Sequence, residues 1–532
     1  MIQDNLLLIL SLLFAISILT MISGKLKVAY PIFLVISGLL VSLIPGIPHI
    51  SLHPDLVFLI FLPPLLYAAA WNTSWNDFWR WKRPISLLGF GLVIFTSAAV
   101  AWVSNLLIPD FSLAAGFLLG GIISPPDAIA ATSVLQGLKV PKRAIIILEG
   151  ESLVNDAASL IVFRFALAAI MTGQFHFWQA TGTFFMVAIL GIVIGLAIAH
   201  FVYFIHRFFP TTPEIDAAFT LISPYIMYIT AEHFHVSGVL AVVSGGLFLT
   251  FRSQDIFSYE ARIQVIGLWN TLVFLMNGFV FILIGLQLPD IIKGMENYSV
   301  SEAISYAVII SLVTILIRIM WVFPATYIPR RLFKSIREKE SNPGWRNVLL
   351  VGWSGMRGVV SLASALAVPL TLADNQAFPH RNLILFITFV VILFTLVLQG
   401  LSLKPLIRLL KIEGDEKLSE NREALDLRLQ LARAVLTHMN TRYAKEIAEN
   451  ETYKRVHDRY ARMISITQKK LENQEAVNET QSFLPHYRQM LLDLVEVRRR
   501  ELNSFRHNNS FSEELIRERE WELDLEEARL RR

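Results

Sequence analysis

The sequence contains no cysteine and carries few charged residues before about Lys411. The lack of cysteine excludes disulfides, thiolate catalysis and cysteine-based metal sites, and it leaves the redox compartment undetermined. So little charge over so long a stretch excludes an ordinary soluble domain. The start, Met1-Ile2-Gln3-Asp4-Asn5, also lacks the basic segment of a signal peptide. We therefore interpret the first apolar run as a retained membrane span.

What the chain does have is a series of long apolar segments. Of its 532 residues, 54% are hydrophobic, and the mean hydropathy is +0.53. Runs of about 18 or more apolar residues are typical of helices that cross a bilayer. We count thirteen such segments and predict an all-α polytopic membrane protein. The segments lie near 5–23, 28–44, 56–71, 86–108, 111–137, 144–171, 179–205, 215–233, 236–250, 264–288, 302–328, 347–371 and 382–410.

The distribution of lysine and arginine predicts the orientation in the membrane. With thirteen spans, the loops on one side carry seventeen such residues and those on the other side only Lys293 and Arg381. Because basic loops stay in the cytoplasm, we expect an outside N-terminus, a cytoplasmic C-terminal tail and a place in the cell (inner) membrane. Charge becomes dense after Lys411, so we divide the chain into a membrane domain, 1–411, and a helical, possibly regulatory cytoplasmic tail, 412–532.

Two of the spans contain helix-breaking sequences. Pro125-Pro126 interrupts the fifth span, and Asp127 directly after them is placed to cap the second half-helix. The twelfth span holds Gly352, Ser354, Gly355 and Gly358 around Arg357, which indicates a second break. If spans 1–6 and 8–13 are repeats, the breaks occupy matching positions with opposite polarity. Inverted repeats with paired discontinuous helices are the architecture of secondary transporters.

Ionisable residues within these spans are the candidates for function. Asp156 ends the stretch Glu149-Gly150-Glu151-Ser152-Leu153-Val154-Asn155-Asp156, and an apolar run follows at once. Charged groups inside a bilayer are costly and usually mark ion pathways, proton relays or buried ion pairs.

The stretch from Gly150 to Asp156, the break Pro126-Asp127-Ala128 and the motif Gly355-Met356-Arg357-Gly358 resemble signatures of the sodium/proton exchanger family, the monovalent cation:proton antiporters. The resemblance covers roughly residues 5–410. It implies a homodimer of thirteen-span subunits, each with a dimerisation domain and a six-helix core in which spans 5 and 12 cross beside span 6. The Asn155-Asp156 pair resembles the electroneutral branch, which exchanges one cation for one proton.

Asp156 is the predicted binding group for both the cation and the proton. A desolvated carboxyl group can hold either species but not both, and this exclusion couples their movements. Asp127 could be a second sodium ligand or only a helix cap, and the Ser152 hydroxyl, one turn before Asp156, could complete the sodium shell or serve only in packing. Asn155 is expected to hold the break in span 5, near Pro126.

Five further residues are weaker candidates. The resemblance suggests that Glu151 pairs with Arg357, which would neutralise a guanidinium in the membrane core. Glu149 could be an acid at the cytoplasmic mouth or a solvated end residue. Arg318 and Arg164 also lie within spans, and the sequence offers no partner for Arg164.

The sequence thus predicts a transporter rather than an enzyme, with no cofactor and no nucleic-acid partner. The expected partners are monovalent cations, protons, the lipid bilayer and a second copy of the chain. Potassium/proton exchange is an alternative, because the preference for a cation depends on cage geometry. An intramembrane aspartyl hydrolase using Asp127 and Asp156 would need two acids about 3 Å apart that share a proton. A cation channel would need an open lining, whereas inverted broken helices favour alternating access.

Overall fold

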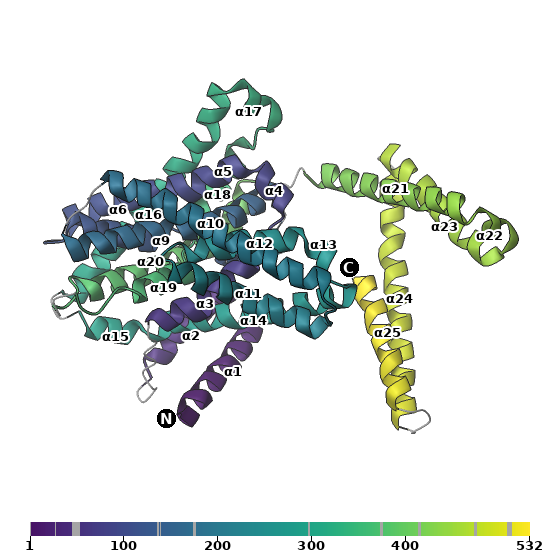
Figure 1. The fold of residues 1–532 in the computed structure, drawn as a ribbon, viewed down its shortest axis with the longest axis horizontal. Coiled ribbons are helices and arrows are strands. Elements are labelled where there is room, and N and C mark those ends of the chain that lie inside the picture. Colours follow the sequence, from purple (N-terminus) through teal and green to yellow (C-terminus); the bar gives the residue numbers. More distant parts are fainter. Residues whose placement is uncertain are drawn as a thin grey trace. The chain divides into compact units, whose positions relative to one another are not determined.

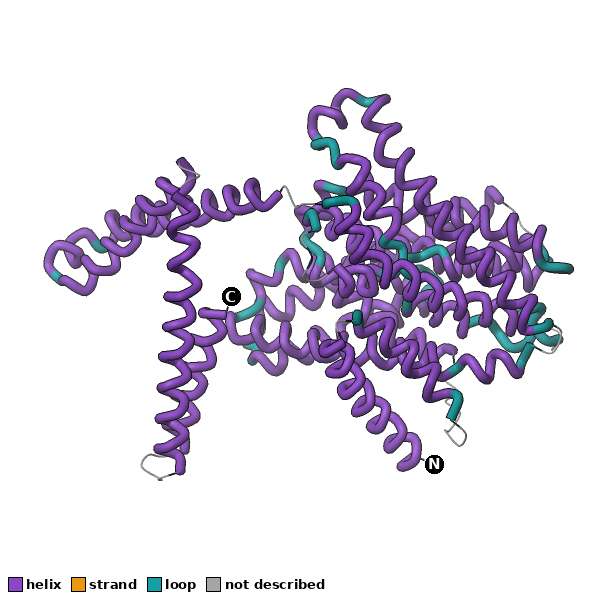
Figure 2. Tube along the Cα trace, turned by 180° about the vertical axis from the view of Figure 1, so that it is seen from behind, coloured by secondary structure: helices purple, strands orange, loops and turns teal. Residues whose placement is uncertain are grey.

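The computed structural model divides into two compact units, residues 1–414 and residues 415–532. The sequence predicts this boundary between residues 411 and 412. It describes residues 2–26, 28–44, 54–135, 138, 140–173, 177–295, 298–372, 376–412, 416–472, 476–507 and 513–531. Helices dominate these residues, and their only β-pairing is an isolated bridge between Thr371 and Ala377. Figure 2 shows this helical content, with short loop segments inside the bundle.

The membrane unit is a bundle of helices of unequal length (Figure 1). Its first half contains α1 (Ile2–Leu26), α2 (Tyr30–Ser42), α3 (Pro54–Asn72), α4 (Trp75–Arg80), α5 (Lys82–Ser86), the π-helical turn η1 (Leu87–Leu92), α6 (Val93–Leu107), α7 (Leu113–Ile123), α8 (Ala128–Leu135), α9 (Lys142–Thr172) and α10 (Phe177–Phe208). Its second half contains α11 (Pro213–His233), α12 (Gly238–Phe251), α13 (Ser253–Ile256), α14 (Tyr259–Leu286), α15 (Leu288–Lys293), α16 (Val300–Leu332), α17 (Lys334–Lys339), α18 (Gly344–Trp353), α19 (Val359–Leu366) and α20 (Arg381–Leu409).

Helices or pairs of helices overlap all thirteen predicted segments. Among the described residues, eight continuous segments are long and apolar enough to cross a membrane, and three shorter apolar helices accompany them. The predicted fifth span is α7 followed by α8, and the predicted twelfth is α18 followed by α19. The separate segments expected on either side of His235 are α11 and α12. The number of membrane crossings and the inverted repeat stay predictions.

The helices of the membrane unit pack in two groups. In one group, α9 packs on α5 to α8, and α16 and α20 pack with the broken helices. In the other, α14 packs on α2 and α11, and α12 packs on α3 and α10. Contacts between the groups are sparser and involve α9 and α19 on one side and α3, α12 and α14 on the other. The candidate site lies where these groups meet.

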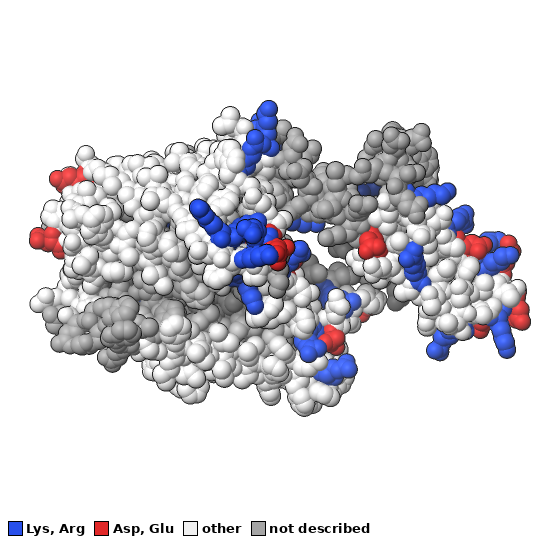
Figure 3. Space-filling view, turned by 90° about the horizontal axis from the view of Figure 1, so that it is seen from above, with Lys and Arg blue, Asp and Glu red and all other residues white. Residues whose placement is uncertain are grey.

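The outer surface of the membrane unit is apolar. Large side chains such as Phe14, Phe201, Leu316 and Met320 are exposed on its helices. On the face seen in Figure 3, much of this unit carries no charge, while the tail unit carries charges of both signs. Such a surface suits contact with lipid chains.

The tail unit consists of two helical pairs. It contains α21 (Glu416–Arg442), α22 (Ala444–Glu449), α23 (Glu451–Glu472), α24 (Ala476–His507) and α25 (Glu513–Arg531). α21 packs on α23 through an apolar stripe that includes Leu429 and Met439. α24 packs on α25, and their surfaces are joined by ion pairs from Arg498 to Glu526 and from Arg499 to Asp524.

Candidate functional site

The breaks in the two discontinuous helices lie against each other. Pro125 and Pro126 fall between α7 and α8, where the missing proline N–H groups prevent a continuous helix. At the crossing point the backbone N–H of Asp127 donates a hydrogen bond of 2.7 Å to the carbonyl oxygen of Met356, in the break between α18 and α19. Each break thus satisfies part of the other's exposed backbone, as a membrane interior requires.

Two arginines bind the carbonyl ends of the half-helices. The Nε of Arg357 donates to the carbonyl oxygen of Ile123, the last residue of α7, at 3.0 Å. Arg318, on α16, donates from Nη2 to the carbonyl oxygen of Val351 in the last turn of α18, at 3.2 Å. A helix C-terminus carries partial negative charge, so both guanidinium groups stabilise ends that lack intrahelical partners.

Asp127 binds the opposite, N-terminal ends. Its Oδ1 accepts backbone N–H groups of Ile129 at 2.8 Å and Ala130 at 3.4 Å, so it caps α8 as the sequence predicts. Its Oδ2 lies against Gly358 at the start of α19, where any Cβ would overlap with it, and it makes no hydrogen bond to the described groups. The carboxylate therefore caps α8 and lies beside the positive end of α19, and glycine at position 358 makes room for it.

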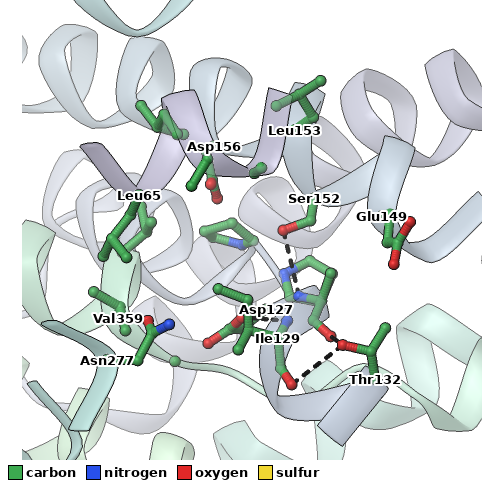
Figure 4. Close-up of a pocket in the computed structure, with 18 of the residues that line it drawn as sticks. Leu65, Asp127, Ile129, Thr132, Glu149, Ser152, Leu153, Asp156, Asn277 and Val359 are labelled. Carbon is green, nitrogen blue, oxygen red and sulfur yellow. Dashed lines mark hydrogen bonds between the residues drawn. The ribbon is translucent and has the colours of Figure 1, made fainter. Parts of the chain in front are cut away.

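The long helix α9 supplies the remaining side chains. Asn155 donates from Nδ2 to the carbonyl oxygen of Pro126 at 3.2 Å, so it holds the break in the way expected from the sequence. The Ser152 hydroxyl accepts the N–H of Ala128 at 3.3 Å. Both contacts fix α9 to the first break, and they bring Asp156 to the level of the crossing (Figure 4).

Asp156 differs from these neighbours because its carboxylate is not tied to the fold. The residue is 7% exposed, and within the described part of the chain no hydrogen bond or ion pair to its side chain is found. Of the two acids at the crossing, Asp127 is tied to the fold through its Oδ1, which caps α8, and Asp156 is free to bind another species.

Both acids line one cavity of about 210 Å³. Its wall continues from Asp156 past Ser152 and Thr132 to Glu149 on α9 and to Thr73 after the end of α3. Glu149, predicted as an acid at the mouth or a solvated end residue, lines this cavity and is half-buried (Figure 4). The described residues hold no group of three or more His, Cys, Asp or Glu placed to bind a metal ion.

A model of the transmembrane part of sodium/hydrogen exchangers matches residues 9–409, and the match spans the breaks, α9 and the cavity. The chain belongs to the sodium/hydrogen exchanger family. Members of this family are secondary transporters.

Named relatives of this exchanger-family chain come from several bacteria. It is 34% identical over 415 residues to the "Sodium, potassium, lithium and rubidium/H(+) antiporter" of Bacillus pumilus, a match covering 76% of this chain and 60% of that protein. The protein of the same name in Bacillus subtilis is 35% identical, with 70% of this chain and 57% of that protein covered. The chain thus spans less than two thirds of both Bacillus proteins. This chain is also 31% identical to the Na(+)/H(+) antiporter ApNhaP of Aphanothece halophytica, a match that covers 82% of this chain and 81% of that protein.

The fold is also that of a solved antiporter. The sodium proton antiporter MjNhaP1 from Methanocaldococcus jannaschii aligns with a TM-score of 0.61 at 20% identity, covering 76% of this chain and 98% of that one. The shared fold includes the region of the broken helices, but the low identity carries no residue-level assignment.

The ion pair predicted between Glu151 and Arg357 is wrong. Both oxygens of Glu151 bind Arg318 of α16, at 2.5 Å from Nη1 and 2.8 Å from Nη2, and both side chains are fully buried. Arg357 instead donates to backbone carbonyls in the breaks, including that of Gly355. Both arginine side chains lie close to Gly355, where an added side chain would collide with Arg318. Sequence spacing could not decide which of the two arginines pairs with Glu151, because both lie close to the same helix break.

Arg164, for which the sequence offered no partner, pairs with Glu232 at the end of α11. Nη2 of Arg164 lies 2.7 Å from each carboxylate oxygen, and Glu232 also accepts the N–H of Gly238 at the start of α12. The pair lines a second cavity of about 370 Å³, further along α9 than the first. Glu232 was missed in the sequence because it ends a predicted span 68 residues away.

Proposed function

We propose that this exchanger-family chain exchanges sodium, or another monovalent cation, for protons across the membrane. Cation and proton would compete for Asp156. One observation carries the proposal: Asp156 lies in the cavity at the crossing with a carboxylate that the described structure leaves unbound, while Asp127 beside it caps α8 through Oδ1.

The competition provides the coupling between the two ions. A bound cation favours the ionised carboxylate, and a proton removes the charge that the cation needs. Ser152 and carbonyl groups freed by the breaks are oxygen ligands suited to a hard cation that has lost water. Asp127 would contribute its field and, through Oδ2, which has no hydrogen-bond partner among the described groups, one further oxygen ligand.

The charges at the crossing support electroneutral exchange. Glu151 is neutralised by Arg318, and Asn155 is neutral where an acid would add a second titrating group. This leaves Asp156 as the one acid free to change its occupant, so one monovalent cation would replace one proton. The name of the Bacillus pumilus relative includes sodium, potassium, lithium and rubidium, so potassium/proton exchange is the alternative within the same mechanism.

Two separate cavities along α9 support alternating access. The first runs from Asp156 to Glu149 and Thr73, next to the basic loops expected in the cytoplasm. The second is lined by Leu160 and Arg164, on the expected outer side. About one helical turn of α9 separates Asp156, in the first cavity, from Leu160, in the second. On α3, Leu62 lines the first cavity and Leu59 lines the second. This arrangement favours an inward-facing form whose outer path is closed.

The arrangement in the cell follows from the sequence. The excess of basic residues in alternate loops supports an outside N-terminus and a cytoplasmic tail in the inner membrane. A homodimer is expected from the family resemblance, and regulation by residues 412–532 is a further expectation.

Everted membrane vesicles test the exchange directly. The vesicles are loaded with acid, each cation is added in turn, and the pH gradient is followed. We expect sodium or another monovalent cation to dissipate the gradient, Asp156→Asn to abolish the effect, and a clamped membrane potential to leave the rate unchanged. Dissipation that survives in Asp156→Asn would reject Asp156 as the shared site, and a rate that follows the potential would reject electroneutrality.

A further inference from the structure

A buried amide faces the same cavity from the other helix group. Asn277 lies on α14, is 1% exposed and lines the cavity together with Asp127 and Asp156. Neither Nδ2 nor Oδ1 of Asn277 has a hydrogen-bond partner among the described protein groups. Figure 4 shows its amide beside Val359, directed toward the region around Asp127.

The surrounding sequence makes this amide unusual. Asn277 is the only polar side chain between Leu272 and Leu286. Its neighbour Gly278 lets α14 approach α1, since a Cβ there would collide with Ile16. A buried amide without partners costs roughly 1–3 kcal/mol. Among the described groups this side chain makes no hydrogen bond, so we expect a species that enters the cavity to offset its cost.

The amide also fits the chemistry of the occupant. Its carbonyl oxygen is a neutral, hard ligand of the kind that hydrated cations accept. Asp156 provides one negative charge, and Ser152 and Asn277 add oxygen ligands without adding charge. A site of this composition balances a single monovalent cation.

We propose that Asn277 is a cation-binding residue, which completes the coordination of the ion from the wall opposite α9, either directly or through one retained water. This inference rests on the proposed exchange at Asp156. Because α14 belongs to the helix group opposite α9 and the broken helices, the bound ion then links the two groups across the cavity.

Asn277→Leu tests the proposal, with Gln399→Leu as the matched control. Gln399, on α20, is also fully buried with both amide atoms unpartnered among the described groups, but it does not line the cavity. Both substitutions remove an unpaired buried amide, so both variants should be at least as thermostable as the parent in sodium-free buffer. Only Asn277→Leu should raise the KM for sodium, by at least about tenfold, because hydrogen bonds and similar contacts to charged groups contribute roughly 1.5–3 kcal/mol. It should also lose most of the sodium-dependent rise in Tm.

An unchanged sodium KM and an unchanged sodium-dependent Tm shift in Asn277→Leu would overturn the inference, as would equal effects in both variants. That result is distinct from failure of exchange at Asp156, which would appear in the parent vesicles or in Asp156→Asn. If Asn277→Leu fails to fold, Asn277→Asp replaces it. The added acid should make sodium affinity depend on a second titrating group, and a pH profile identical to that of the parent would overturn the inference.

Discussion

The helix α9 carries two ion pairs, one on each side of Asp156, and they differ in almost every physical respect. Glu151 and Arg318 are fully buried and joined by two hydrogen bonds, and Arg318 also caps the end of α18. Arg164 and Glu232 keep 44% and 30% of their side chains exposed. The first pair lies within one helix group, whereas the second joins α9 to α11, in the other group.

The difference in burial distinguishes an ion pair with a structural role from an ion pair that can open. Removing one partner of a buried pair leaves an unpaired charge and costs about 3–5 kcal/mol. A pair with this much exposure contributes only about 0.2–1 kcal/mol. We therefore expect the buried pair to stay closed and keep α9 joined to α16, and the exposed pair to separate and re-form when the two helix groups move.

The largest expected effect comes from breaking the buried pair. Glu151→Gln should destabilise the protein by about 3–5 kcal/mol, because it leaves the Arg318 guanidinium without its counter-charge. The double variant Glu151→Gln/Arg318→Met should recover much of this loss, since no buried charge is left unpaired. Thermal unfolding in detergent measures both. A single variant as stable as the parent would contradict the structural role.

The second effect concerns movement at the exposed pair. Because the chain has no cysteine, Arg164→Cys/Glu232→Cys can be bridged by a bifunctional methanethiosulfonate without other sites reacting. We expect the bridge to stop exchange and reductant to restore it, since α9 must move relative to α11. The control Ile192→Cys/Ser244→Cys joins α10 to α12 within one group, where Ser244 contacts the carbonyl of Ile192. Full exchange in the bridged Arg164/Glu232 variant would exclude a moving contact.

A smaller effect should follow when the exposed pair is only weakened. Arg164→Gln should change the free energy of unfolding by less than about 1 kcal/mol. It should nevertheless increase the rate at which an impermeant thiol reagent, added outside, labels Leu160→Cys in the second cavity. Unchanged labelling combined with unchanged stability would show that the pair does not close the outer path.

The smallest effect extends the comparison to the partly exposed ion pairs of the tail. Arg498 lowers the pKa of Glu526, and Arg531 together with Arg499 lowers that of Glu527. A lowered folded-state pKa contributes stability above the unfolded value of about 4.3, and this contribution disappears as the pH falls through the lowered value. Spin labels at Met490→Cys and Leu525→Cys of the full chain should therefore report an α24–α25 distance that broadens only in acid. Adding Arg498→Gln should move the broadening to higher pH.

The sequence predicted the parts of the site that depend on local chemistry. Pro125-Pro126 required a break, and the next residue, Asp127, was the natural cap for α8. Asn155 was expected to hold that break because its side chain is neutral where electrogenic relatives carry an acid. The predictions for the break and for Asp127 needed only helix rules and the cost of unpaired groups in a membrane.

Pairings between distant helices were beyond the sequence. Arg318 and Arg357 are both arginines within spans, and only the packing of α16 against α18 decides which one reaches Glu151. Glu232 lies near the end of a predicted span, and nothing in the sequence indicates that it pairs with Arg164. Asn277 did leave a signal, a lone amide in an apolar run, but a single polar residue in a span does not reveal which cavity it faces.

The competition at Asp156 is tested most directly by the protons released when sodium binds. Purified protein in weakly buffered solution is titrated with sodium while the pH is followed. The account predicts release that approaches one proton for each sodium ion bound when Asp156 is protonated beforehand, and neither binding nor release in Asp156→Asn. Sodium binding without proton release, or release that persists in Asp156→Asn, would contradict it.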